Sequence, residues 1–189
     1  MATSRITGGE WRGRQLTTPA GLEVRPTRGM VRQALFNILG ARIAGAPVVD
    51  LYAGAGSLGF EALSRGAVHA TFVDRRPQSL GLIAATARRF GCEDRVELVA
   101  ADAIAWLRRG PEQVSGAAVC FVDAPYRDDR LTVALELLGG LAPALVVCEH
   151  HRARALPAEL GALSAVRTAH YGLTDLTLYR RREQEEPTP

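Results

Sequence analysis

The feature that most constrains this chain is the regular alternation, from Pro47 onward, of short apolar stretches with segments of helical periodicity. Residues 48–52, 70–74, 95–100, 117–123 and 144–150 read as strands, and residues 57–65, 77–90, 103–109 and 130–138 read as the helices between them. Such alternation predicts a parallel sheet with helices on both faces. The strands are apolar along their length, as central strands buried on both sides are.

The C-terminal part of the chain breaks this rhythm. Residues 164–172 and 173–182 read as two strands joined by a tight turn at Gly172, which adds one antiparallel strand. We therefore expect an α/β, Rossmann-like fold with a mostly parallel seven-stranded sheet and one antiparallel strand. Residues 183–189 are charged and lack apolar side chains, so a disordered tail is expected there.

The first 45 residues differ from the rest in pattern and in charge. Residues 5–16 read as a small hairpin, and residues 28–40 have helical spacing and end at a glycine. This extension (1–45) holds seven arginines against two acids, whereas residues 46–189 hold sixteen arginines against eighteen acids. A basic arm on a near-neutral domain (46–182) suggests a polyanionic partner. A merely solvated surface is the alternative.

The cysteines and the apolar runs argue against several classes of protein. Cys92, Cys120 and Cys148 stand far apart and form no CxxC pair, which indicates neither a disulfide framework nor a zinc site. Core thiols fit a reducing cytosol. The first residues lack the apolar segment of a signal peptide, and no apolar run reaches the roughly 18 residues of a membrane span. We expect a cytoplasmic protein without a membrane partner.

A glycine-rich loop follows the first predicted strand of the domain. Gly54, Gly56 and Gly59 match G-x-G-x-x-G, and Asp74 lies twenty residues beyond Gly54 at the end of the second strand. A dinucleotide fold uses the same layout, with the acid on the ribose hydroxyls. The context therefore favours a nucleoside cofactor without choosing one, and a purely structural turn or an Asp74 helix cap remains open.

Two acidic residues help to distinguish between a dinucleotide and S-adenosylmethionine as the cofactor. Asp50 precedes Gly54 by four residues in the D-x-x-x-G-x-G pattern that S-adenosylmethionine enzymes favour, whereas a carboxylate would repel a pyrophosphate. Asp102 can accept from the adenine amine beside the Ala103 N–H, or it can simply cap the following helix. We expect S-adenosylmethionine and a class I methyltransferase fold. The predicted cofactor-binding residues are Asp50, Tyr52, Gly54, Gly56, Asp74, Arg75, Asp102 and Ala103.

The sequence "DAPY", residues 123–126, ends the fourth strand of the domain, at the edge where open α/β sheets bind ligands. It resembles the (D/N/S)-P-P-(Y/F/W) motif of amino-methyltransferases. Asp123 and the Ala124 carbonyl can hold an exocyclic amine, and Pro125 restricts Ala124 to an extended conformation. Tyr126 can stack on an extruded base. An ordinary turn is the alternative. Transfer from a sulfonium needs no metal, and none is expected.

Residues 5–182 together resemble the RsmD-type 16S rRNA guanine-N2 methyltransferases. The resemblance rests on "RITGGEWRGRQL" (5–16), "RPT…VRQALFNIL" (25–39), "DLYAGAGSLGFEALSRGA" (50–67) and "FVDAPY" (121–126). It implies methylation of one guanine of 16S rRNA within 30S or pre-30S particles, by a monomer. The chain departs from the family pattern where Ala124 replaces a proline, and at Gly29, Met30 and Gln33.

If the substrate is structured RNA, the arm should contact it first. The predicted RNA-contacting residues are Arg5, Trp11, Arg12, Arg14, Arg25, Thr27 and Arg28. The arginines would meet phosphates, which give affinity and salt dependence rather than base identity. Trp11 would stack on a base, or else pack the arm onto the domain. The other functions considered are a DNA adenine-N6 methyltransferase, a non-catalytic RNA-binding assembly factor, and a nicotinamide dehydrogenase.

Overall fold

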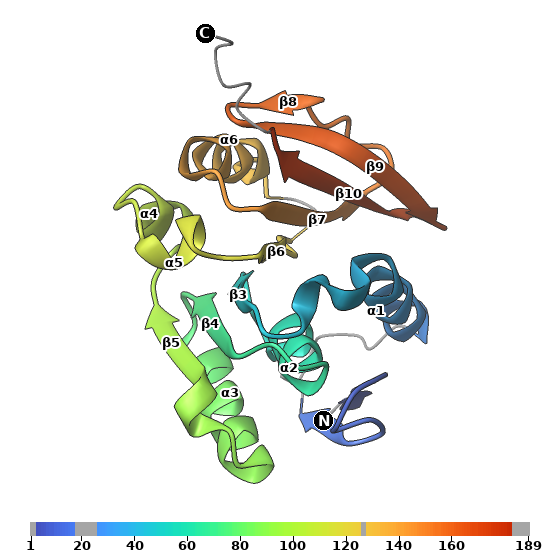
Figure 1. Ribbon diagram of the computed structural model, residues 1–189, viewed down its shortest axis with the longest axis vertical. Coiled ribbons are helices and arrows are strands. Elements are labelled where there is room, and N and C mark those ends of the chain that lie inside the picture. The colour runs from blue at the N-terminus through green and yellow to red at the C-terminus, as the bar shows by residue number, and fades with distance from the viewer. Residues whose placement is uncertain (1–2, 18–25, 126–127, 183–189) are drawn as a thin grey trace, which may run out of the picture.

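The computed structural model describes residues 3–17, 26–125 and 128–182. Within them, an eight-stranded sheet has the order β5-β4-β3-β6-β7-β10-β9-β8 (Figure 1). The strands are β3 (Pro47–Leu51), β4 (His69–Asp74), β5 (Val96–Ala100), β6 (Val119–Val122), β7 (Leu145–His151), β8 (Glu159–Leu160), β9 (Leu163–Tyr171) and β10 (Thr174–Arg181). The predicted tail, Arg25 and Tyr126 lie outside the described residues.

The sheet confirms the predicted α/β class and its mostly parallel character. Strands β3 to β7 pair in parallel, and β10 runs antiparallel to both β7 and β9. The expected number of strands was one too low, because β8 pairs antiparallel with the start of β9. A strand of two residues is too short to show an alternating pattern, so periodicity could not reveal it.

Helices cover both faces of the sheet. Helices α1 (Pro26–Leu39), α2 (Ser57–Ser64) and α3 (Pro77–Phe90) lie on one face, and α4 (Ala103–Leu107), α5 (Glu112–Ser115) and α6 (Leu131–Leu141) lie on the other. Neighbouring strand residues separate accordingly: Val48 packs into the core under α1–α3, and Val49 packs into the core under α4–α6. The short α5 and the 3-10 turns η1 (Gly40–Ile43) and η2 (Glu93–Arg95) were not predicted. None of the helices that the described residues form is long and apolar enough to cross a membrane.

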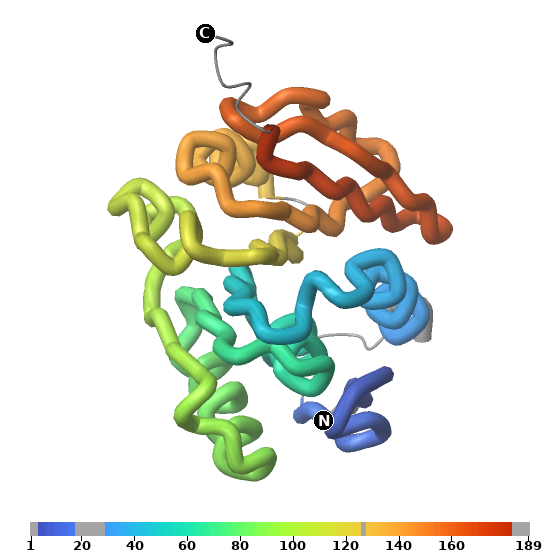
Figure 2. Tube along the Cα trace, viewed as in Figure 1, coloured from blue at the N-terminus to red at the C-terminus, as the bar shows by residue number. Residues whose placement is uncertain are grey.

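Strands β1 (Thr3–Arg5) and β2 (Gln15–Thr17) confirm the small hairpin predicted for residues 5–16, and this hairpin packs directly onto the domain. Figure 2 shows it beside α2, remote from the β8–β10 end. Trp11 is 4% exposed, and its ring lies 4.8 Å from that of Phe90 in α3. The expectation that Trp11 stacks on RNA is therefore wrong for this structure, since burial against Phe90 is the better place for its apolar ring.

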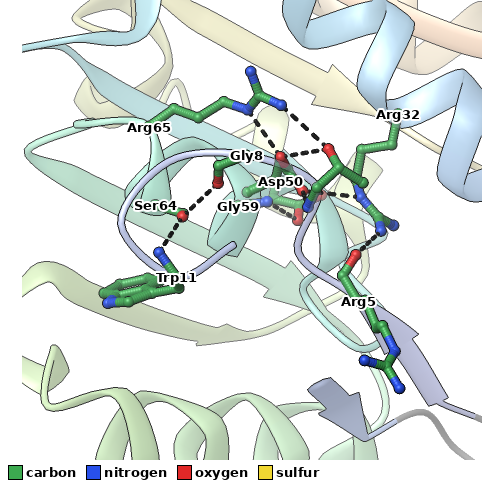
Figure 3. A network of polar contacts seen from close by, with 10 residues as sticks. Arg5, Gly8, Trp11, Arg32, Asp50, Gly59, Ser64 and Arg65 are labelled. Carbon is green, nitrogen blue, oxygen red and sulfur yellow. Dashed lines mark hydrogen bonds and ion pairs between the residues drawn. The ribbon is translucent and has the colours of Figure 1, made fainter. Parts of the chain in front are cut away.

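The loop of the hairpin is held by Ser64 of α2 (Figure 3). The Trp11 N–H donates to the Ser64 hydroxyl at 2.9 Å, and that hydroxyl donates to the Gly8 carbonyl at 2.7 Å. At Gly9, where φ is 79°, a Cβ atom would lie 1.9 Å from the Ser64 carbonyl oxygen. Only glycine permits this contact, which explains the glycine at position 9.

A buried carboxylate joins the hairpin to two helices. Glu61 of α2 is fully buried and accepts hydrogen bonds from the N–H and the hydroxyl of Thr7, at 2.8 and 2.7 Å. It also pairs with Arg65 at 2.8 Å and with Arg32 of α1 at 3.2 Å, and Arg32 donates in turn to the Arg5 carbonyl. Burial lowers the pKa of Arg32, and the Glu61 charge opposes this shift.

Glu61→Ala should lower the free energy of unfolding by about 3–5 kcal/mol, because it leaves the buried Arg32 guanidinium without its counter-charge. Urea denaturation measures the change. Glu159→Ala is the matched control, since the Glu159–Arg182 pair is more than half exposed on both sides and should contribute less than about 1 kcal/mol. Equal losses in the two variants would contradict a special role for Glu61.

Candidate active site

The carboxyl ends of the parallel strands bring the predicted acids to one edge of the sheet. Asp50 in β3 lies opposite Phe72 of β4 and Phe121 of β6. In this register, β4 ends at Asp74 and β6 ends just before Asp123 at the same edge as the glycine loop. The structure therefore assembles residues that are up to 73 positions apart in the sequence, as the predicted topology requires.

Glycine stands at the three positions of the loop for different structural reasons. Gly56 and Gly59 pack against Phe72, whose ring would lie 2.9 Å and 2.2 Å from a Cβ atom at these two positions. Gly54 has a φ of 56°, and a Cβ there would meet nothing closer than 3.8 Å. Gly54 is thus the glycine that leaves open space above the loop, where a ligand can approach the backbone.

Asp50 is 2% exposed and supports the loop from below. Its carboxylate accepts the Gly59 N–H at 2.9 Å, which fixes the first turn of α2 (Figure 3). Burial raises the pKa of Asp50 well above its usual range, the Gly59 hydrogen bond opposes the rise, and the nearby Asp123 charge adds to it. The structure thus gives Asp50 a structural contact, and direct contact with a ligand stays a prediction.

Asp74 ends β4 and faces the same loop. Its Oδ2 accepts the Gly54 N–H at 2.8 Å, and its Oδ1 accepts the Arg76 N–H at 2.9 Å. The Arg76 side chain also reaches both oxygens, at 3.2 and 3.3 Å. Burial would raise the pKa of Asp74, but the hydrogen bonds from Arg76 and Gly54 outweigh it and hold the pKa below its usual value. Asp74 is therefore an ionised acceptor at neutral pH.

Arg76 is the residue at this edge that sequence reasoning missed. Arg75 was predicted to bind the cofactor, which stays a prediction, and Arg76, which is exposed like Arg75, makes the contacts to Asp74. The available signal was position: Arg76 is the N-cap of α3, and Pro77 follows it in the first helical turn, as predicted. The N-cap backbone faces back toward the end of β4, and this orientation brings the Arg76 N–H to Asp74.

Asp102 caps a helix, which is one of the two alternatives that the sequence left open, and its contact with adenine stays a prediction. It is the N-cap of α4, where its Oδ1 accepts the Ala105 N–H at 3.2 Å, and Ala103 behind it is buried. Its Oδ2 pairs with Arg130 at 3.2 Å. Burial would raise the pKa of Asp102, but the contacts with Ala105 and Arg130 hold it below its usual value. The capping alternative is thus present, and one oxygen still faces the loop after β6.

The loop after β6 begins with Asp123, which is partly buried, and Ala124, which is 3% exposed. The Asp123 charge helps to raise the pKa of both Asp50 and Cys148, so it lies near the centre of this edge. Pro125 is exposed, and its carbonyl accepts the Asp128 N–H at 2.8 Å across the undescribed positions 126 and 127.

Two arginines hold the far side of this loop. Arg130 pairs with Asp128 at 3.4 Å as well as with Asp102, and Arg154 donates to the Asp128 carbonyl at 2.8 Å. The loop that carries Asp123 is therefore connected to the start of α4 on one side and to the segment after β7 on the other.

Tyr52 stands between these groups with an unusual conformation. Its φ is 60°, and its hydroxyl is buried without a hydrogen-bond partner among the described residues. Burial raises the pKa of Tyr52 to about 12, and the charges of Asp128 and Asp102 add to this effect. A buried hydroxyl without a hydrogen bond is destabilising. A bound ligand or an ordered water would supply the missing hydrogen bond of Tyr52.

The described arginines of the arm do not form one surface. Arg5 and Arg12 are exposed. Arg14 instead donates to the Arg89 carbonyl at 2.6 Å and lies 3.9 Å above the Phe90 ring, so it serves to attach the hairpin to α3. Thr27 and Arg28 lie in the first turn of α1.

The strand order, the antiparallel β10 and the glycine loop after β3 together define the fold of the class I S-adenosylmethionine-dependent methyltransferases. The family described as "Conserved hypothetical protein 95" matches residues 4–180. The chain therefore belongs to this family, that of the RsmD-type methyltransferases.

Individual relatives are similar to this chain over nearly its full length. "Ribosomal RNA small subunit methyltransferase D" of Escherichia coli is 37% identical over 96% of this chain and 92% of its own. YlbH of Bacillus subtilis is 32% identical over 94% and 99%. A solved Escherichia coli structure, 31% identical, superposes with a TM-score of 0.82 over 97% of this chain and all of its own.

Gly59→Ala should lower the free energy of unfolding by about 1–3 kcal/mol, because its methyl group would enter the space of the Phe72 ring. Gly81→Ala is the matched control. Gly81 also lies in a helix, a Cβ there meets nothing within 4 Å, and helix propensity should make the variant about 1 kcal/mol more stable. Urea denaturation of both variants gives the comparison. A destabilised Gly81→Ala or a neutral Gly59→Ala would contradict the close packing of Gly59 against Phe72.

Proposed function

We propose that this protein transfers the methyl group of S-adenosylmethionine to the exocyclic N2 of one guanine of 16S rRNA. The observation that carries the proposal is the position of Asp123, Ala124 and Pro125. They stand at the end of β6, at the same edge as the glycine loop, in a chain similar over its length to a ribosomal RNA small subunit methyltransferase. In this proposal the reaction takes place in the cytoplasm, on 30S or pre-30S particles, and the protein acts as a monomer.

The residues at this edge fit the cofactor. The open space at Gly54 suits close approach to the backbone, and the ionised Asp74 and Asp102 can accept from ribose hydroxyls and from the adenine amine. The Tyr52 hydroxyl, which has no hydrogen-bond partner in the described part of the chain, offers a further donor. When bound, S-adenosylmethionine supplies an electrophilic methyl group on a sulfonium, which needs no metal.

Asp74 and Asp102 already have protein partners, and a ligand must share these carboxylates with the partners or replace them. A carboxylate offers about four acceptor positions. On Asp74, two are used by backbone N–H groups and the others face the guanidinium of Arg76, whose side chain is 52% exposed. The Arg76 side chain can move into water at small cost, as exposed ion pairs contribute little. Arg130, half exposed beside Asp102, can do the same.

The chemistry of the transfer depends on the amine. The lone pair of an exocyclic guanine amine is delocalised into the ring, so the amine is a poor nucleophile. Hydrogen bonds from its N–H groups to Asp123 and to the Ala124 carbonyl would hold it out of the ring plane. The Asp123 carboxylate would also stabilise the positive charge that develops on the nitrogen and can accept its proton. Tyr126 would stack on the extruded base.

The replacement of the usual first proline by Ala124 does not remove the acceptor. The required group is a backbone carbonyl, and Pro125 still restricts the conformation of the residue before it. Ala124 is 3% exposed, so packing also holds this part of the loop. The departure of this chain from the family pattern at Ala124 is thus compatible with the proposed reaction.

Asp123→Ala should reduce methyl incorporation at least about 100-fold, the usual range for loss of a general base or an electrostatic stabiliser. The assay uses purified protein, labelled S-adenosylmethionine and 30S particles from a strain that lacks the enzyme, followed by mapping of the labelled nucleotide. Asp94→Ala is the control, because Asp94 is an exposed acid in η2, away from the site. Cofactor binding, measured by calorimetry, should survive in both variants.

The same assay decides between the alternatives. Label in DNA rather than in 30S particles would mean an adenine methyltransferase. Absence of label, with normal particle binding by Asp123→Ala, would mean a non-catalytic assembly factor. Binding of NAD in place of S-adenosylmethionine would mean a dehydrogenase.

Asp74→Ala should weaken S-adenosylmethionine binding by roughly 10- to 100-fold, as expected when a hydrogen bond to a charged group is lost. Calorimetry without RNA measures the affinity, and the melting temperature shows whether the loop remains folded, since Asp74 also accepts from Gly54. An unchanged affinity in a folded variant would remove Asp74 from the cofactor site.

A further inference from the structure

A basic groove lies on the α1 side of the sheet, away from the candidate active site. It has a volume of about 170 Å³ and lies between the end of α1 with η1 and the β9–β10 pair. Its floor is apolar and includes Ile38, Leu145 and Leu178, while Arg42, Arg167 and Arg180 complete its lining. We refer to it as the arginine groove.

Acids neutralise several arginines of the protein, and the three arginines of this groove are not among them. Arg32, Arg65, Arg76, Arg130, Arg152 and Arg182 form ion pairs with acids. Within residues 3–17, 26–125 and 128–182, no ion pair is formed by Arg42, Arg167 or Arg180, and no acid lines the groove. Arg42 donates only to the Leu39 carbonyl, at 3.4 Å.

The exposure of these side chains makes the charge available. Arg42, Arg167 and Arg180 are all exposed, and they come from three separate elements, η1, β9 and β10. Like charges around one hollow repel each other, so an anion that enters it gains from all three. Guanidinium groups also suit phosphate oxygens better than ammonium groups do, because they donate two parallel hydrogen bonds.

The position of the groove sets its relation to the active site. Leu145 is the first residue of β7, and Arg180 of β10 is its direct partner, whereas the active-site edge lies at the other end of β7. A seven-residue strand spans roughly 20 Å. Helix α1 runs alongside this path, with Thr27 and Arg28 in its first turn and Ile38 at the groove (Figure 1).

We infer that the arginine groove binds the sugar–phosphate backbone of the RNA substrate, about one strand length from the reacting base. The inference rests on the proposed function, since it takes the polyanion to be the methylated rRNA. The guanidinium groups would neutralise phosphates and the apolar floor would contact the sugars. Such a contact positions the RNA and adds affinity without reading its sequence.

The test compares the double variant Arg167→Gln/Arg180→Gln with the wild-type protein. Binding of a single-stranded RNA homopolymer is measured over a range of salt concentrations, and the kinetics of methylation are measured on 30S particles. Loss of two phosphate contacts should reduce the slope of log K against log salt by about 1.4. The KM for particles should rise roughly 10-fold, while kcat and the affinity for S-adenosylmethionine stay within twofold.

The control is Arg108→Gln/Arg109→Gln, which removes two exposed charges that follow α4 on the opposite face. The control should keep the wild-type slope and KM. If its slope and KM change as much as those of the Arg167/Arg180 variant, the effect comes from net charge alone and the inference is overturned. A wild-type slope in the Arg167/Arg180 variant would also overturn it. A raised KM with an unchanged homopolymer slope would overturn the inference, because the groove would then contact a protein of the particle. A reduced slope with an unchanged KM would overturn it as well.

The outcomes for the groove and for the function are separate. If the wild-type protein methylates the particles in an Asp123-dependent way and the groove variant behaves like wild type, only the groove inference fails. If the wild-type protein transfers no methyl group to the particles, the proposed function fails. Melting temperatures and cofactor binding of all variants show that their folds are intact.

Discussion

The buried carboxylate of Glu61 is the interaction on which the arrangement of this protein depends. A fully buried acid is tolerated only where charges and hydrogen bonds satisfy it, and here two arginines and Thr7 do so from three separate segments. Removing one of these partners would leave part of the buried carboxylate without a hydrogen bond or a counter-charge. The hairpin, α1 and α2 are therefore held in one arrangement, and the arm is an integral part of the folded body.

The same helix carries this constraint to the cofactor loop. Glu61 lies one turn after the start of α2, and that start is fixed by Asp50 through the Gly59 N–H and by the contact of Gly59 with Phe72. A shift of the hairpin would move α2, and with it the backbone of Gly54 and Gly56. The N-terminal extension thus helps to shape the edge where the cofactor would bind, through its contacts with α2.

Most of the architecture could be predicted because apolar periodicity is a local property. The strands and the long helices were recognised from it, and Pro77 and Gly91 mark the ends of α3 as helix-capping rules require. The two-residue β8 and the four-residue α5 were missed because each spans only about one period, which is too short for a pattern to repeat. The positions of Asp50, Asp74, Asp102 and Asp123 at one edge followed from topology alone.

The contacts within the site could not be predicted in the same way. Whether Trp11 and Arg14 face RNA or pack onto Phe90 depends on tertiary packing between segments about 80 residues apart. The choice of Arg76 over Arg75 as the partner of Asp74 depends on the direction in which the chain leaves β4. Such contacts depend on the path of the folded chain in space, and the pattern of residue types along the sequence does not determine that path.

The outer strand of the sheet has a consequence for how copies of this protein meet. β8 pairs with only the first two residues of the nine-residue β9, and the Ala165 N–H donates to the Ala158 carbonyl at 2.8 Å. An outer strand of this length can offer its later backbone groups to a second chain. The pairing of β9 has a register shift opposite Leu178 and Tyr179, and bulges of this kind bend a strand. Arg167 and His170 add exposed charged or polar side chains along β9. A bulged margin that carries a charged and a polar side chain is a poor template for edge-to-edge pairing with a second sheet.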